Sequence, residues 1–277
     1  MRRGAVVLAA LLCGSAPARG QTFVNGNIIT PTTWTVAGSP YIVTGQRLVK
    51  FGSTLTIQPG VVVKFNANCG LAQDPATGVS SIVAVGKADS IIVFTSNVAV
   101  PAAGSWASVS VTDSLSSSQF SHCVFMYATQ GLYLTRAGAP VDHCSFSDCQ
   151  TGLYMVESSP SVTSTWITDC TSEGVRCVKN VTVPAIVCSP TLYECNISNP
   201  GPGAMNIRLQ GYSDAPLEQI SALGNWWGTD DPLEIAARIY DRNDNSSIHG
   251  EVDFTDYLSS PGVEQTSWGS IKALFRE

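Results

Sequence analysis

The sequence predicts an all-β solenoid, in which short parallel strands stack coil upon coil. The main observation is a repeat of about 21 residues, because the run His122–Phe125 returns as His143–Phe146, and Gly131–Leu134 returns as Gly152–Met155. Within each copy, apolar residues alternate with polar or aromatic ones, which is the period of a β-strand. Self-similarity at a fixed period of this length is typical of solenoids and other repeat architectures.

Aligned copies give columns of like residues, and stacked strands would turn each column into a ladder of side chains about 4.8 Å apart. A unit of about 21 residues is too short for a strand–helix–strand motif of about 30 residues, but it accommodates three short strands with tight corners. The Gly column is expected at a corner, where glycine tolerates a positive φ. The columns are Phe120, Val141, Val162 and Leu192; Cys123, Cys144, Thr165 and Cys195; Phe125, Phe146, Ile167 and Ile197; Ala128, Cys149 and Cys170; and Gly131, Gly152 and Gly174, followed by Leu132/Leu134, Leu153/Met155 and Val175/Cys177.

Two other all-β architectures also place short strands at regular spacing, the sandwich and the propeller. A propeller blade needs about 40 residues or more per repeat, which is longer than the period in this chain. Several columns agree on the single period, which makes the sandwich the weaker alternative. We therefore favour the solenoid.

Residues 1–224 divide into three parts. Residues 1–20 are typical of a secretory signal, since two arginines precede an apolar run and Ala16–Ala18 fits a cleavage site. Residues 21–45 are predicted to be an N-terminal cap, because the open end of a solenoid has unpaired strand edges that must be covered. The β-helix is predicted for residues 46–224, with a loop at Cys69–Gly78.

The C-terminal part contains a tryptophan pair and a short tail. Residues 225–260 are predicted to be a capping module, in which the motif Asn225–Thr229 brings a large apolar area to the last coil. The apolar residues from Leu233 to Ile239 have helix spacing. Residues 261–277 are predicted to be a linker and a short amphipathic tail. We expect this tail to dock to a sorting or surface partner, or to pack on the solenoid as a helix.

A family resemblance adds to these observations. The run Gly52–Val61 resembles the opening coil of the right-handed parallel β-helix repeat family of secreted bacterial proteins, and the columns look like that family's repeats across roughly residues 40–225. The resemblance implies a right-handed parallel β-helix with capped ends. It also implies a secreted or cell-surface location, with the periplasm as the alternative. It implies no particular ligand, because a fold does not determine a function.

Charge and cysteine usage narrow the function classes. The net charge of −6 and the lack of a basic cluster argue against a nucleic-acid partner. No stretch beyond residue 20 is long and apolar enough to span a membrane. Eight cysteines remain if residues 1–20 are removed, and an even count suggests disulfides in an oxidising compartment. We favour packing as small hydrophobes in the ladders Cys123/Cys144 and Cys149/Cys170, with Cys177–Cys188 or Cys188–Cys195 as alternative bridges.

His122 and His143 are weak candidates for a metal site. They share a column and are expected to stack outward or at a corner, and histidine is the commonest metal ligand. A third ligand is not apparent, since Asp142 at strand spacing would point elsewhere. The resemblance keeps the idea open, because some copper-site maturation proteins share the fold. No resident cofactor is predicted from these residues.

Asp148 and Asp169 are candidates for catalysis. On neighbouring coils their carboxylates would lie about 5 Å apart, near the separation of a retaining glycosidase pair. The resemblance implies that glycan-active β-helices use acids on one face, and that some lyases combine a basic residue with calcium-binding acids. The alternative is that both aspartates only stabilise turns. The nearby charged residues of the repeat are Arg136, Arg176, Lys179 and Arg208, with Glu157 and Glu173.

We therefore expect a secreted, non-catalytic structural or glycan- and envelope-binding module, whose long faces rich in Ser, Thr and Tyr suit extended polymers. The alternative is a polysaccharide lyase or hydrolase that uses Asp148 and Asp169, with calcium as its cofactor. A third hypothesis is a periplasmic metal-handling protein that uses His122 and His143. The chain contains no Gly-rich phosphate loop, nucleophile elbow or paired-cysteine redox motif.

Overall fold

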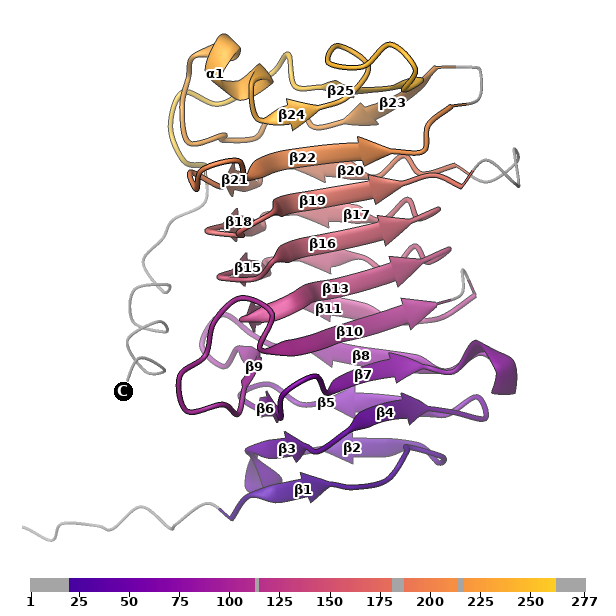
Figure 1. Ribbon diagram of the computed structural model, residues 1–277. Helices are drawn as coiled ribbons and strands as arrows, with labels where there is room; N and C mark the ends of the chain where they lie inside the picture. Colours follow the sequence, from indigo (N-terminus) through magenta and orange to yellow (C-terminus); the bar gives the residue numbers. More distant parts are fainter. Residues whose placement is uncertain (1–19, 113–114, 181–186, 214–216, 263–277) are drawn as a thin grey trace, which may run out of the picture.

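A computed structural model of the chain is a parallel β-solenoid built from three sheets (Figure 1). It describes residues 20–112, 115–180, 187–213 and 217–262. Nearly all of the predicted signal sequence and the amphipathic tail therefore lie outside the described residues. Each coil contributes one strand to each sheet, and the coils rise with a right-handed sense in Figure 1. The predicted fold class is confirmed.

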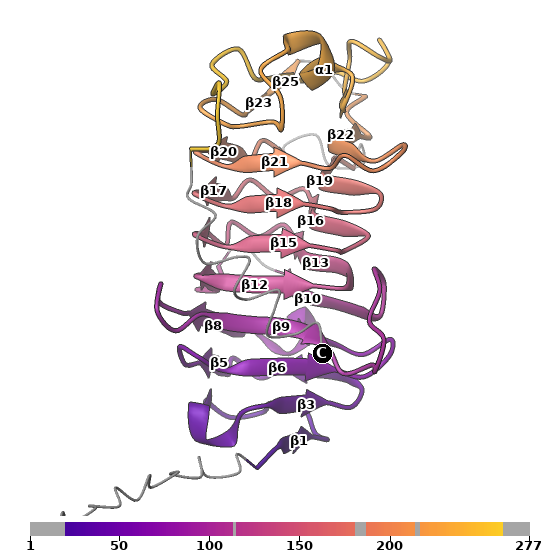
Figure 2. The same ribbon diagram turned by 90° about the vertical axis from the view of Figure 1, so that its left-hand side faces the viewer.

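Sheet A forms the face turned toward the viewer in Figure 2. Its strands pair only in parallel, as expected for neighbouring turns of one coil. In spatial order they are β1 (Thr22–Val24), β3 (Tyr41–Val43), β6 (Val62–Phe65), β9 (Ile92–Ser96), β12 (Cys123–Met126), β15 (Ser145–Ser147), β18 (Trp166–Thr168) and β21 (Asn196–Ser198).

Sheet B has the longest strands and faces the viewer in Figure 1. Apolar residues in its strands point inward and alternate with half-exposed residues, as a period of two requires. Its strands in spatial order are β4 (Gln46–Val49), β7 (Gly70–Gln73), β10 (Trp106–Thr112), β13 (Ala128–Thr135), β16 (Thr151–Val156), β19 (Glu173–Val178), β22 (Met205–Gln210) and β24 (Ile239–Tyr240).

Sheet C closes the third side of each coil with short strands. They are β2 (Thr32–Trp34), β5 (Thr54–Ile57), β8 (Ser81–Val85), β11 (Gln119–Ser121), β14 (Val141–Asp142), β17 (Ser161–Thr163), β20 (Thr191–Tyr193), β23 (Glu218–Ser221) and β25 (Gly250–Asp253). The helical segments are η1 (Val36–Gly38), η2 (Pro75–Thr77) and α1 (Pro232–Ala236). Among the described residues, no helix has the length and hydrophobicity needed to cross a membrane.

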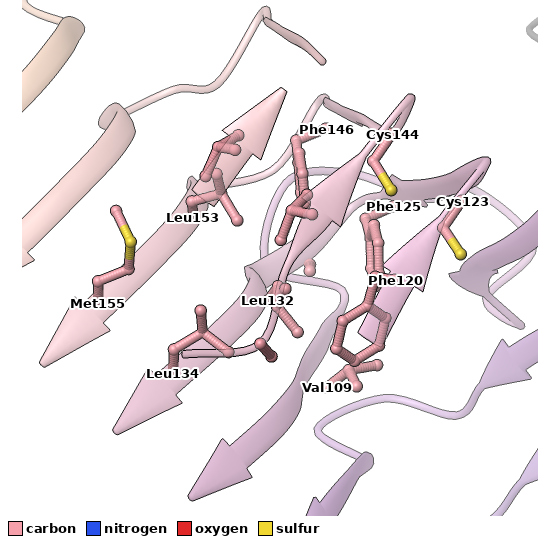
Figure 3. Packing of buried hydrophobic residues seen from close by; sticks show 14 of the residues in the cluster. Val109, Phe120, Cys123, Phe125, Leu132, Leu134, Cys144, Phe146, Leu153 and Met155 are labelled. Carbon is pink, nitrogen blue, oxygen red and sulfur yellow. The ribbon is translucent and has the colours of Figure 1, made fainter. Parts of the chain in front are cut away.

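The register of the strands confirms the predicted columns. Phe125 pairs with Phe146, and Phe146 pairs with Ile167, so the aromatic column is a true ladder. Phe94 extends it by one coil, with ring centroids 4.7 Å from Phe125, and Phe125 lies 4.8 Å from Phe146. Figure 3 shows the rings of Phe125 and Phe146 beside the leucines of sheet B, including Leu132. This continuous apolar interior is the largest source of stability in the fold.

The Gly column does not lie at a corner, and that prediction was wrong. Gly131, Gly152 and Gly174 lie inside β13, β16 and β19, and none has a positive φ. A Cβ atom on Gly131 would lie 2.8 Å from the carbonyl oxygen of Gly152, and one on Gly152 would lie 2.7 Å from that of Gly174. The column is glycine because neighbouring coils approach each other closely there.

The corners are formed instead by residues with side chains in the left-handed region. Their φ values lie between 46° and 67°. This conformation costs an L-residue roughly 1–2 kcal/mol, which the stacking of successive coils must offset. The corner residues are His122, His143, Ser164 and Glu194 between sheets C and A; Tyr127, Asp148 and Asp169 between sheets A and B; and Arg136 and Glu157 between sheets B and C.

Two local predictions need correction. The predicted loop Cys69–Gly78 contains β7 and η2. Residues 21–45 contain β1, β2 and β3, which join the ladders, and their role as a cap stays a prediction. The predicted helix is shorter than its apolar spacing indicates. It spans only α1, where the Asp231 carboxylate accepts a hydrogen bond from the backbone N–H of Leu233. Ile239 lies in β24 and pairs with β22.

The tryptophan motif packs against the end of the solenoid. Asn225 accepts a hydrogen bond from the backbone N–H of Cys195 at 2.7 Å and donates one to the carbonyl of Leu192 at 2.9 Å. Trp227 is buried and its ring meets Phe254 edge-on, with centroids 6.2 Å apart. These contacts join the motif to the last coils, and its capping role stays a prediction. The described cysteines are all buried and free.

Candidate functional site

The two histidines of the predicted column stack at the corner between sheets C and A. The ring centroids of His122 and His143 lie 4.8 Å apart, and the ring planes differ by 5°. The strand spacing predicted that Asp142 would point away from the histidines, and that prediction was wrong. The left-handed corner turns the His143 ring toward Asp142. Nδ1 of His143 lies 2.8 Å from Oδ2 of Asp142, and Thr163 donates to Oδ1 at 2.6 Å.

This stacking is the wrong geometry for a shared metal ion. A metal binds an imidazole in the plane of the ring at about 2.0–2.1 Å from the nitrogen, and two nearly parallel planes 4.8 Å apart at the centroids have no common point at that distance. Within the described part of the chain, no three His, Cys, Asp or Glu side chains gather where they could hold an ion. Partial burial, and then the charge of His143, lower the pKa of His122.

Asp148 and Asp169 occupy the corner between sheets A and B, one coil apart. Both have left-handed backbones, with φ of 53° and 55°. Aspartate is among the few residue types that adopt this conformation readily, because its short polar side chain can hydrogen-bond locally. Asp148 is half-buried and Asp169 is exposed, and neither lines the cavities described below. Their positions are explained by backbone geometry, and the catalytic pair stays a prediction.

A different set of side chains, aromatic and basic, forms a continuous column on the surface of sheet B. Along the outward face of sheet B, register places one residue of each coil directly above the previous one. We call this set the outer ladder of sheet B. All of its members are half-exposed. They are Tyr133, Tyr154, Arg176, Arg208 and Tyr240, on β13, β16, β19, β22 and β24 (Figure 1).

Glu173 orients the two arginines of the ladder. Its carboxylate lies 3.5 Å from Nη1 of Arg176 and 3.1 Å from Nε of Arg208, and it accepts a hydrogen bond from the Thr151 hydroxyl at 3.0 Å. The side chain of Glu173 is only 9% exposed, whereas those of Arg176 and Arg208 are 28% and 31% exposed. One buried carboxylate therefore positions two guanidinium groups that remain accessible from solvent.

The arginines also lie over the tyrosines of the ladder. The guanidinium carbon of Arg176 is 5.3 Å from the ring centroid of Tyr154, and that of Arg208 is 4.6 Å from Tyr240. Both distances fall within the range of cation–π attraction. The rings of Tyr133 and Tyr154 are 5.1 Å apart and tilted by 47°. The ladder is thus a connected stripe in which flat groups lie close to one another.

A cavity of about 380 Å³ lies at the C-terminal end of this stripe. Both arginines and Tyr240 line it, together with Gln210, whose amide oxygen accepts a hydrogen bond from Arg176. Asn245 and Ser247 add further polar groups to the lining. The lining can offer cationic, amide and hydroxyl donors to a polar ligand, beside an aromatic face.

Sequence reasoning found part of this site. It named six charged residues of the repeat as near one another without pairing them. The structure brings Arg176, Arg208 and Glu173 together and pairs Arg136 with Glu157 at 2.6 Å at another corner. Lys179 instead forms a buried ion pair with Glu218. The ladder itself was missed, although the sequence contains a signal for it. In each copy one large polar or aromatic residue stands between two apolar column residues, and these residues are Tyr133, Tyr154, Arg176 and Arg208.

A larger cavity of about 540 Å³ lies beside the tryptophan motif, lined in part by Trp227 and Arg238. Nη1 of Arg238 donates to the carbonyls of Asn199 at 2.7 Å and Ala204 at 3.2 Å. These bonds tie the C-terminal module to the loop after β21. The charge of this arginine is thus used to join two segments of the chain, so this cavity is a weaker candidate site than the outer ladder of sheet B.

Comparison with protein-family models, with curated proteins and with solved structures found no match to this chain.

Proposed function

We propose that the protein is a secreted or cell-surface, non-catalytic binding module that holds an extended polymer, such as a glycan of an envelope or matrix, on the outward face of sheet B. The observation that carries this proposal is the outer ladder of sheet B. It repeats once per coil of about 4.8 Å, so its five members span roughly 19 Å. A polymer with a regular repeat could therefore make the same kind of contact with successive members of the ladder.

The chemistry of the ladder supports a sugar polymer in particular. Tyr133, Tyr154 and Tyr240 offer ring faces, on which the apolar faces of sugars pack while the phenol groups reach polar atoms. Arg176 and Arg208 offer planar hydrogen-bond donors, which suit hydroxyl and carboxylate groups. The signal-like residues 1–20 support exposure outside the cytoplasm.

The test is a screen of the purified protein against neutral and acidic polysaccharides, with binding and depolymerisation scored together, with and without calcium. We expect binding without cleavage. The Tyr154→Ala variant should bind about two- to tenfold more weakly, because a stacking contact contributes about 0.5–1.5 kcal/mol.

Tyr193→Ala is the matched control, because Tyr193 is an exposed tyrosine on sheet C, away from the ladder. Equal loss in both variants would contradict a binding role for the ladder. Depolymerisation that disappears in an Asp148→Asn variant would replace the proposal with the enzyme alternative.

A further inference from the structure

The middle of sheet A is buried on both of its faces. Residues alternate sides along a strand, so Phe94, Phe125 and Phe146 point into the solenoid while their neighbours point outward. These outward residues should be solvent-exposed, as they are in sheets B and C. Instead, none is more than 3% exposed: Val93, Thr95, Val124, Met126, Ser145 and Ser147.

The apolar members of this face form a cluster separate from the main core. Val93, Val124 and Met126 contact one another and are flanked by the partly buried Val62 and Ile91. We call these five residues the outer patch of sheet A. Val62 pairs with Val93 in register, so it lies on the same face one coil further along sheet A. Parallel strands that are buried on both faces need a layer of chain over them.

We propose that the C-terminal segment, residues 263–277, is that layer and docks on the outer patch of sheet A. The described chain ends in the right place for this. Tyr257 forms a bridge with Asn225, and the neighbouring Trp226 forms one with Asn196 of β21. The backbone N–H of Leu258 donates to the carbonyl of Asn225 at 2.8 Å. The chain therefore leaves the solenoid at the C-terminal end of sheet A itself.

The length of the segment fits the distance to be covered. Val124 lies five coil steps from Tyr257 along sheet A, which is roughly 24 Å at about 4.8 Å per step. The 15 residues beyond Gly262 span roughly 22 Å as a helix and up to about 50 Å when extended. The segment can therefore reach the whole patch when it is at least partly extended.

The composition of the segment fits an apolar surface. Trp268, Ile271 and Phe275 have the spacing of one helix face, and Leu274 lies next to that face. Lys272 and Arg276 fall between them and would stay in solvent. The sequence suggests two roles for the tail, docking to a partner and packing on the solenoid. The proposal selects the second.

Trypsin cleavage after Lys272, followed by intact-mass spectrometry on the purified protein, tests the proposal. A docked segment is cleaved slowly. Val124→Asp places a charge in the patch and should speed cleavage at least tenfold, and Trp268→Asp should do the same from the other side of the contact. Gln119→Asp is the matched control, since Gln119 is an exposed outward residue of sheet C, and it should leave the rate unchanged.

Trp268→Asp lies outside the solenoid strands, so it remains informative if Val124→Asp fails to fold. Rapid cleavage of the unmodified protein, at the rate of the Trp268→Asp variant, would overturn the proposal. So would an unchanged rate in both variants. A dimer that dissociates in Val124→Asp without any change in cleavage would assign the patch to a second copy of the chain and equally refute docking of the segment.

Discussion

Sheets A and B are built from the same coils, yet their outward faces differ. The outward residues in the middle of sheet A are small or flexible and fully buried, among them Val124 and Met126. Those of sheet B are large, half-exposed and charged or aromatic, among them Tyr154 and Arg208. The inward ladders of the two sheets form one core.

This difference shows which residues determine what each face can do. Inward residues fix the coil and are interchangeable apolar groups, so they say little about function. Outward residues leave the fold unchanged and decide whether a face is covered by chain or open to a ligand. The function of a solenoid is therefore carried by the positions that its repeat pattern constrains least.

The largest expected effect comes from a change in the apolar core that sheets A and B share. Phe146→Asp places a carboxylate in the aromatic ladder, where Phe146 is 0% exposed. The cost of burying an unpaired charge should exceed about 4 kcal/mol and abolish the cooperative thermal transition followed by circular dichroism. Phe146→Leu should cost much less, because it stays apolar. A normal melting curve for Phe146→Asp would contradict the assignment of the ladder.

The next effect concerns the spacing of sheet B. Gly152→Ala places a Cβ atom 2.7 Å from the carbonyl oxygen of Gly174, and we expect a loss of about 1–3 kcal/mol in the free energy of unfolding, typical of overpacking. The control is Gly138→Ala, where a Cβ meets nothing within 4 Å; this change should stay within about 0.5 kcal/mol. Equal stability of both variants in urea denaturation would show that the coils do not approach as closely as described.

A third prediction sharpens the role of the open face. Glu173→Gln removes the carboxylate that positions Arg176 and Arg208, so the free energy of unfolding should fall by about 1–3 kcal/mol. Glu234→Gln, at an exposed position of α1, should change it by less than about 0.5 kcal/mol. Removing the acid should also raise affinity for an acidic polysaccharide relative to a neutral one. An unchanged ratio of the two affinities would argue against contact between the arginines and the polymer.

The smallest expected effect concerns the stacked histidines His122 and His143 at the corner between sheets C and A. The pKa of His122 is held below its ordinary value of 6.5 by burial and by the charge of His143. Just below pH 6.5 the unfolded chain therefore binds more protons than the folded one, and the free energy of unfolding falls as the pH drops from 7.5 to 5.5. His122→Asn, which tolerates the left-handed corner, should weaken this dependence in urea titrations. Identical slopes would exclude a contribution from His122.

The hydrogen bonds at Asp142 do not confuse this measurement. Burial alone would raise the pKa of Asp142, but hydrogen bonds from Thr163 and His143 hold it below the ordinary value of 3.8. Stability from this group is present above about pH 3.8 and is lost only as the pH falls through the lowered pKa. The two titrations therefore occupy separate pH windows.

Sequence reasoning captured the ladders because a period of 21 residues is written directly in residues such as Phe125 and Phe146. It misread Gly152, because close approach of two backbones and a turn both select glycine, and the sequence alone does not separate them. It also missed the outer ladder of sheet B. Tyr240 joins that ladder through a coil whose spacing no longer follows the repeat, so its register is visible only in three dimensions.

The difference between the two faces is tested most directly by oxidative footprinting of two methionines. Met126 lies on the outward face of sheet A and is 0% exposed, whereas Met205, the first residue of β22 in sheet B, is half-exposed. Both have the same intrinsic reactivity toward hydroxyl radicals or peroxide, which convert methionine to its sulfoxide. We expect rapid oxidation of Met205 and little of Met126 in the native protein. Oxidation of both at equal rates would contradict the account, because sheet A would then be as open as sheet B.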